Sequence, residues 1–201
     1  MSLEKAIAKF KAGELVIITD HHTRENEGDL VLSSLLATAQ NINFMTKYGR
    51  GLVCVTITEF RAKELELIEQ PKRNNNDISC AFTVSVDASC LSTSGISVKD
   101  RTKTINTLAD INAKADDLAT PGHVFPVVAV AGGLNARDGH TEASIELCLR
   151  AGLYPSAVIC EILAEDGSAA SGTEIAELAV KFDIPVVSIA DLLATMGETY
   201  E

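Results

Sequence analysis

Three carboxylates, Glu25, Glu27 and Asp29, stand at alternate positions in a short acidic segment. If this segment is extended, the three side chains share one face, because successive side chains of an extended chain point to opposite sides. Carboxylates held together repel one another, so a bound cation or a raised pKa on one of them must offset the repulsion. Hard oxygen ligands suit Mg²⁺ or Mn²⁺, and a carboxylate beside such a metal can act as a general base. Arg24, just before them, can hold an anionic substrate group. The alternative is a solvated acidic turn.

A second segment combines groups that bind phosphate. Arg137 and Gly139 come just before the start of a predicted helix. A helix N-terminus presents unpaired backbone N–H groups and a partial positive charge, so a phosphate binds there readily. Gly139 permits close approach, Thr141 adds a hydroxyl and Arg137 adds a cation. His140, next to that phosphate, can ligate a metal through a neutral ring nitrogen. The alternative is an ordinary helix start, with Thr141 as the cap and Glu142 interacting with the helix dipole.

Two further residues are candidates for proton transfer. His123 lies in the turn-forming run Thr120–Pro126, and Glu161 ends an apolar run. Taken alone, His123 is interpreted as a hydrogen-bonded structural histidine, with proton transfer as the alternative. A carboxylate among buried strand residues needs a partner, either structural or catalytic. We do not place His21 and His22 in the site, because neighbouring histidines in a loop usually point apart.

The elements that must position these groups alternate between helical and strand-like patterns. Apolar spacing, capping residues and glycine stops predict helices at Leu3–Lys11, Asn41–Tyr48, Thr58–Leu65, Ser97–Leu108, Thr141–Ala151 and Thr173–Phe182. Runs of β-branched or alternating residues predict strands at Glu14–Asp20, Asp29–Ser34, Leu52–Ile57, Ala81–Asp87, Val124–Ala131, Ala157–Leu163 and Pro185–Ile189. This order predicts an α/β fold: a single three-layer domain over residues 1–201, with a mixed β-sheet covered by helices. The pattern does not predict the strand order.

The composition limits the classes of function. The chain has 201 residues, of which 46% are hydrophobic and 22% are charged, as expected for a globular domain with a real core. The net charge of −11 disfavours nucleic acid as a partner, because phosphate backbones require basic patches. We expect no membrane partner and no secretory signal, because no apolar run is long enough. The five cysteines are scattered, without a CxxC pair, and favour reduced thiols in a cytoplasmic protein.

Three spaced motifs together resemble one family. Residues 20–30 are DHHTRENEGDL, residues 121–126 are PGHVFP, and residues 132–153 are GGLNARDGHTEASIELCLRAGL, followed by AVICE at 157–161. In order and spacing they are similar to 3,4-dihydroxy-2-butanone 4-phosphate synthase, from about Ile7 to Leu193. The resemblance implies conversion of D-ribulose 5-phosphate to 3,4-dihydroxy-2-butanone 4-phosphate and formate, in riboflavin biosynthesis. It also implies a divalent cation, Mg²⁺ or Mn²⁺, at one or two ions per site.

The resemblance implies roles for individual residues as well. It makes Glu25 and His140 the metal ligands. The implied substrate contacts are Arg24, Glu25, Asp29, Arg137, Gly139, His140, Thr141 and Glu161. The implied catalytic residues are His123, Glu161, Asp29 and Glu27, and the residues implied to line the pocket are Asp20 and Cys54. The family also implies a homodimer whose sites are completed across the interface.

Two features depart from the family's pattern. The family usually continues PGHVFP with Leu-Arg-Ala, whereas here Val128 replaces the arginine. This replacement puts in doubt a salt bridge or interface contact, but none of the metal or phosphate residues. Many relatives also carry a GTP cyclohydrolase II domain, and nothing here resembles one, so we expect a monofunctional chain. We further expect the loops Asp20–Asp29 and Lys72–Ser79 to be mobile without ligand. The rival functions are a metal-dependent isomerase or aldolase and a non-catalytic module that binds a phosphometabolite or a nucleotide.

Overall fold

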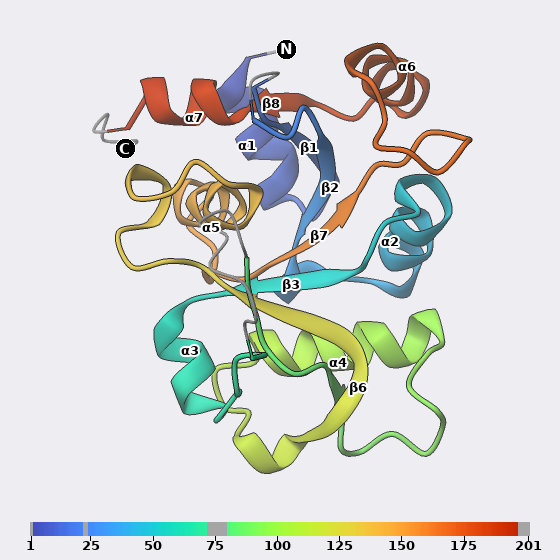
Figure 1. Ribbon diagram of the computed structural model, residues 1–201, viewed down its shortest axis with the longest axis vertical. Coiled ribbons are helices and arrows are strands. Elements are labelled where there is room, and N and C mark those ends of the chain that lie inside the picture. Colours follow the sequence, from blue (N-terminus) through green and yellow to red (C-terminus); the bar gives the residue numbers. More distant parts are fainter. Residues whose placement is uncertain (1, 22–23, 72–79, 197–201) are drawn as a thin grey trace.

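The computed structural model describes residues 2–21, 24–71 and 80–196, and a mixed β-sheet runs through the middle of it (Figure 1). Its strands are β1 (Val16–Thr19), β2 (Gly28–Ser33), β3 (Cys54–Ile57), β4 (Ala81–Phe82), β5 (Val86–Ala88), β6 (Leu118–Val128), β7 (Ala157–Glu161) and β8 (Val186–Ser188). They lie in the order β4-β6-β3-β7-β2-β1-β8, and β5 pairs with β6. The β1–β8 and β3–β6 pairs are parallel, whereas β1–β2, β2–β7 and β3–β7 are antiparallel. The predicted mixed sheet is therefore confirmed.

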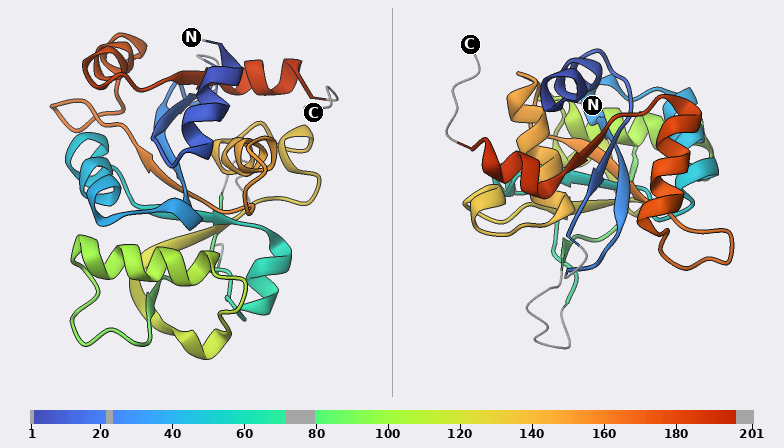
Figure 2. Two further views of the ribbon diagram at one scale, coloured as in Figure 1. Left: turned by 180° about the vertical axis from the view of Figure 1, so that it is seen from behind. Right: turned by 90° about the horizontal axis from the view of Figure 1, so that it is seen from above.

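Helices cover both faces of this sheet. They are α1 (Leu3–Lys11), α2 (Ala39–Phe44), α3 (Glu59–Glu64), α4 (Val98–Ala109), α5 (His140–Arg150), α6 (Gly172–Phe182) and α7 (Ile189–Ala194). One core lies between the sheet and α2, α4 and α6, and includes Ile17 and Leu30. Their neighbours Ile18 and Val31 belong to a second core beneath α1, α5 and α7. Figure 2 shows these helices on opposite sides of β1 and β2, so the three predicted layers are present.

Capping residues account for several helix starts. The Thr58 hydroxyl accepts a hydrogen bond from Arg61 N at 3.2 Å, and the Ser97 hydroxyl accepts one from Asp100 N at 3.1 Å. Each such cap stabilises a helix by about 1 kcal/mol. The first helix ends before Gly13, whose φ of +82° favours glycine. These three signals are confirmed as predicted from the sequence.

The predicted single strand Ala81–Asp87 is wrong, because it is two short strands against β6. Phe82 pairs with Val127 and Val86 pairs with Val124. The chain advances four residues from Phe82 to Val86 but only three from Val124 to Val127 on β6, so it has one extra residue. The extra residue forms a bulge, which interrupts the ladder. The bulged stretch keeps its backbone partners, since Thr83 N donates to Pro126 O at 2.9 Å.

Other boundaries also differ from the prediction. The sixth strand begins at Leu118 rather than Val124 and ends at Val128. The predicted helix Asn41–Tyr48 is α2 followed by one turn of π-helix, Met45–Gly49. Ile189 begins α7 instead of ending a strand, because Ser188 and Asp191 form a reciprocal capping box.

The loop Lys72–Ser79, which we expect to be mobile without ligand, lies outside the described residues. Among the residues that are described, no helix combines the length and apolar character that crossing a membrane requires.

Candidate functional site

The acidic segment is the loop of the β1–β2 hairpin, and Asp20 organises it. One oxygen of the Asp20 carboxylate accepts hydrogen bonds from Glu25 N at 3.0 Å and from Arg24 Nη1 at 2.9 Å. The other oxygen accepts from Glu27 N at 2.8 Å. Burial alone would raise the pKa of Asp20, but these three donors outweigh it and hold that pKa below its ordinary value. Asp20 therefore acts as a fixed anion that shapes the loop.

The hairpin loop is not extended in the way its alternating carboxylates suggested. Arg24 and Glu25 lie in a turn, and Asn26 has a φ of 57°. Only Gly28 and Asp29 of this stretch belong to β2. The prediction that the carboxylates share one face of a strand is therefore wrong, and the turn brings them together instead.

The phosphate-binding candidate lies at the start of α5. This helix begins at His140, with Gly139 as the N-cap residue, so Thr141 is not the cap. Because glycine has no side chain, no side-chain cap occupies the helix N-terminus. A Cβ at position 139 would lie 2.0 Å from Nη1 of Arg137, so glycine is needed for the guanidinium to come this close. The helix start and the arginine thus form one cationic surface.

Arg137 is held in place by Glu142, a residue that the sequence analysis assigned only to the helix dipole. Nη1 of Arg137 lies 2.6 Å from a carboxylate oxygen of Glu142, which is 1% exposed. The other oxygen of Glu142 accepts from Val130 N at 3.1 Å. On its far side the guanidinium contacts Cys80 Sγ at 3.4 Å. The buried carboxylate therefore fixes the direction of the guanidinium.

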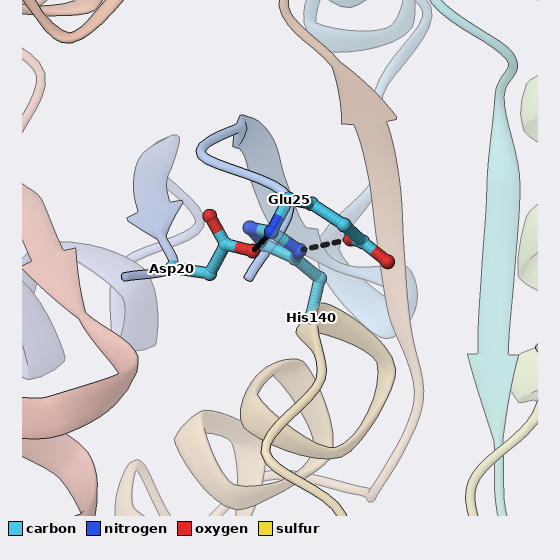
Figure 3. Close-up of side chains that lie close together, drawn as sticks. All are labelled: Asp20, Glu25 and His140. Atoms are coloured by element: carbon cyan, nitrogen blue, oxygen red, sulfur yellow. Dashed lines mark hydrogen bonds and ion pairs between the residues drawn. The ribbon is translucent and has the colours of Figure 1, made fainter. Parts of the chain in front are cut away.

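The two predicted metal ligands face each other across the hairpin loop and α5. Oε2 of Glu25 lies 3.9 Å from Nδ1 of His140, and one ligand atom each from Asp20, Glu25 and His140 lies within 4.8 Å of the others (Figure 3). Nε2 of His140 is buried without a hydrogen-bond partner among the described residues. Imidazole and carboxylate ligand atoms gathered this closely suit a divalent cation. Since the oxygens of Asp20 already accept three hydrogen bonds, Glu25 and His140 are the better ligands.

Asp29 and Glu161 lie opposite each other in the β2–β7 ladder. Asp29 is 3% exposed, and burial, reinforced by Glu161 and opposed by His140, raises the pKa of its carboxyl to about 6. An oxygen of Glu161 accepts from Leu52 N at 2.7 Å, which fixes that carboxylate. Burial, followed by the charge of Glu25, also raises the pKa of Glu27. The Asp29 carboxyl can therefore hold or release a proton near neutral pH.

A chamber of about 70 Å³ joins most of the predicted residues. Its polar and charged lining residues are Arg24, Glu25, Glu27, Asp29, Arg137, His140, Thr141 and Glu161. Cys54 and Cys80 complete part of its wall, and burial raises the pKa of the Cys54 thiol far enough to keep it neutral. A larger cavity of about 480 Å³ shares Cys80, Arg137 and Thr141 with it and also contacts Val128.

Three predicted residues are not among those lining the chamber. Asp20 accepts hydrogen bonds from the backbone of the hairpin loop, and Gly139 is the N-cap residue of α5. His123 is on β6, where its Nδ1 lies 2.7 Å from a carboxylate oxygen of Asp87, and its side chain is 39% exposed. The sequence pattern did not predict that Asp87 contacts His123 or that Glu142 contacts Arg137. The only signal for these roles in the sequence is that each is a charged residue within a predicted strand or helix.

Comparisons with known proteins agree on one family. The profile of the 3,4-dihydroxy-2-butanone 4-phosphate synthase family matches residues 4–195. A synthase of that name from Helicobacter pylori is 44% identical over 192 residues, which cover 94% of this chain and 56% of that protein. The riboflavin biosynthesis protein RibBA of Endomicrobium trichonymphae is 43% identical over 192 residues, covering 96% of this chain and 48% of that protein. The chain thus spans about half the length of the curated relatives it matches.

Solved structures match equally well. A synthase crystallised in complex with two magnesium ions superposes with a TM-score of 0.92 at 37% identity, covering 99% of this chain and 98% of that one. A two-domain synthase from A. baumannii has a TM-score of 0.93 at 38% identity, and the match covers 99% of this chain and 59% of that one. Sequence, fold and site geometry therefore converge, and the chain belongs to the 3,4-dihydroxy-2-butanone 4-phosphate synthase family.

Proposed function

We propose that the chain converts D-ribulose 5-phosphate to 3,4-dihydroxy-2-butanone 4-phosphate and formate, with Mg²⁺ or Mn²⁺ as cofactor. The observation that carries this proposal is the chamber itself. It joins two cationic groups, four carboxyl groups and the His140 imidazole, which come from the β1–β2 hairpin, β7 and the region of α5. A phosphorylated ketose needs an anchor for its phosphate and groups that polarise its oxygens and move protons, and the chamber contains both.

The phosphate is assigned to the start of α5. There the hydroxyl of Thr141, the Arg137 guanidinium and the backbone N–H groups after Gly139 converge, and an anion is stabilised by the helix dipole as well as by charge. Arg137 and Thr141 lie on the wall shared with the larger cavity, which gives a sugar phosphate room that the chamber of about 70 Å³ lacks.

The carbonyl end of the substrate is assigned to the acidic side. Glu25 and His140 would hold the cation, at one or two ions per site, and a bound Mg²⁺ supplies a Lewis acid that favours loss of a proton next to a carbonyl. Asp29, with its pKa raised to about 6, and Glu161, held by Leu52 N, are the proton carriers. Glu27 and His123 are the further candidates, and Arg24 orients an oxygen of the substrate.

Formate release from ribulose 5-phosphate tests the reaction directly. Metal-stripped protein should release no formate, added Mg²⁺ should restore release, and Glu25→Ala should abolish it at every Mg²⁺ concentration. Glu177→Gln, an exposed carboxylate on α6, is the matched control and should keep full activity. If folded, metal-loaded protein consumes the ketose without formate, the isomerase or aldolase alternative replaces this proposal. If it binds the ketose unchanged, the binding-module alternative does.

We also propose that the chain acts as a homodimer in the cytoplasm. His123 lies outside the lining of the chamber and is part-exposed, so a second copy of the chain would bring this histidine to the site. The five cysteines are all unpaired, which suits a reducing compartment.

A further inference from the structure

His123 is held by a clamp, the carboxylate of Asp87, which contacts it at two points and to which no role in the proposed reaction has been assigned. Oδ1 of Asp87 accepts a hydrogen bond from the backbone N–H of His123 at 3.0 Å, and Oδ2 lies 2.7 Å from Nδ1 of its ring. Both oxygens of one carboxylate thus serve a single residue, on its backbone and on its side chain. The side chain of Asp87 is 14% exposed, whereas that of His123 is 39% exposed. The clamp is therefore shielded while the far edge of the imidazole stays accessible.

The backbone around the clamp requires this arrangement. Val86 pairs with Val124 and Asp87 pairs with Ala119, so the register shifts across residues 120–123, where Gly122 N donates to Ser85 O at 3.0 Å. At Gly122 the two strands approach so closely that a Cβ would lie 2.0 Å from the carbonyl carbon of Val86. His123 is the next residue, so this close approach of the two strands places it beside Asp87. A glycine is needed here for the histidine to reach the carboxylate.

A second glycine closes the other side of the carboxylate. Gly95 has a φ of +92°, and a Cβ there would lie 2.1 Å from Oδ2 of Asp87. Two glycines therefore pack against one carboxylate–histidine pair that lies apart from the metal ligands.

We propose that Asp87 is a positioning residue for His123, and that it sets which ring nitrogen exchanges protons with the substrate. This inference rests on the proposed function, in which His123 is a proton carrier. A carboxylate only accepts hydrogen bonds, so Nδ1 of the neutral ring carries the proton and Nε2 is left as the acceptor. When Nε2 takes a proton from the substrate, the Asp87 charge stabilises the imidazolium, which then returns the proton.

Asp87→Asn is the sharpest variant, because the clamp itself determines how the amide must lie. The backbone N–H of His123 can only donate, so the amide oxygen must face it and the amide NH₂ must face Nδ1. The ring is then driven into the other tautomer, with the proton on Nε2, where it cannot act as a base. We expect kcat for formate release to fall roughly 100-fold or more while KM changes less than about threefold, because Asp87 does not touch substrate.

Asp100→Asn is the matched control. Asp100 is also an aspartate of this region: its carboxylate accepts from the Thr93 hydroxyl at 2.8 Å, and its backbone N–H donates to the Ser97 hydroxyl at the start of α4, so its described partners do not include His123. Its substitution should leave kcat and KM unchanged. Equal kcat for wild type and Asp87→Asn, or equal losses in Asp87→Asn and Asp100→Asn, would overturn the proposal.

The tautomer is measured on the protein itself by ¹⁵N NMR of its histidines at about pH 9, where imidazole is neutral. The His123 signals are assigned by their loss in His123→Asn. We expect Nδ1–H in the wild type and Nε2–H in Asp87→Asn, and a wild-type ring protonated on Nε2 would overturn the proposal even if the variant failed to fold. This readout needs no turnover. Protein that shows the expected tautomers but releases no formate would refute the proposed function and leave the clamp as a structural finding.

Discussion

Among the carboxyl groups in the described part of the site, Asp29 has the most strongly shifted pKa. It is 3% exposed in the β2–β7 ladder, and burial raises its pKa from 3.8 to about 6. The folded chain therefore binds this proton more tightly than the unfolded chain does. The stability that follows is fully present below about pH 4 and is lost as the pH rises through about 6. At neutral pH the ionised Asp29 destabilises the metal-free protein, which is the cost of having a proton carrier there.

Asp29→Asn should therefore stabilise the metal-free protein while it inactivates the enzyme. At pH 7.5 we expect the free energy of unfolding in urea and EDTA to rise by on the order of 2 kcal/mol, and at pH 3.5 we expect no gain. Formate release should fall at least about 100-fold. The exposed Asp116→Asn serves as the control and should change neither quantity. A gain in stability that is the same at both pH values would show that the charge of Asp29 is not its cause.

At the scale of elements, the start of α5 and the residues just before it carry the groups assigned to the phosphate, and the buried Glu142 of α5 fixes Arg137 among them. The same helix carries a second acid–arginine pair, Glu146 with Arg150 at 2.7 Å, away from the chamber. The two pairs have similar geometry, since Glu142 and Arg137 are 2.6 Å apart. One helix thus offers a site variant and a matched control.

Glu142→Gln should weaken substrate binding. The amide can still accept from Val130 N, but Arg137 loses its charged partner and its fixed direction. We expect KM for ribulose 5-phosphate to rise about tenfold, equivalent to about 1.4 kcal/mol, with a smaller change in kcat. Glu146→Gln should leave KM unchanged. Equal KM values in the two variants would show that the contact between Glu142 and Arg137 does not contribute to substrate binding.

How far the sequence predicts these elements depends on the kind of signal. Helix caps at Thr58 and Ser97 are local, and both were predicted correctly. The chamber residues were found because their types and order resemble a family. The turn at Asn26 was missed because alternation of carboxylates mimics a strand. The partners Asp87 and Glu142 were missed because each acts across strands or turns, and such pairing depends on a strand order that the sequence pattern does not contain.

At the scale of the whole molecule, the question is whether one chain contains all the residues of a complete site. The chamber and the Asp87–His123 pair lie in separate places on the same chain, and the proposed homodimer would unite them. In a two-fold dimer each of two sites would then use the hairpin of one copy and the histidine of the other.

Mixed dimers test this arrangement. Glu25→Ala and His123→Asn should each be inactive alone. Co-expressed with different tags and purified as a heterodimer, they should show about half the wild-type turnover per dimer, because one site combines both intact residues. A heterodimer without activity would place each site within one chain. Light scattering at micromolar concentration, giving the mass of two chains, is the accompanying check.

The strand order also has a consequence for folding during synthesis on the ribosome. Leu30 of β2 pairs with Cys160 of β7, and Ile17 of β1 pairs with Val186 of β8, so the first strands made receive neighbours that are synthesised roughly 130 residues or more later. At ~5–20 residues per second, the apolar β1–β2 hairpin waits at least about 6 seconds for them. Nascent chains therefore present an unpaired strand edge during translation, which is where chaperone capture or misassembly with another nascent chain begins.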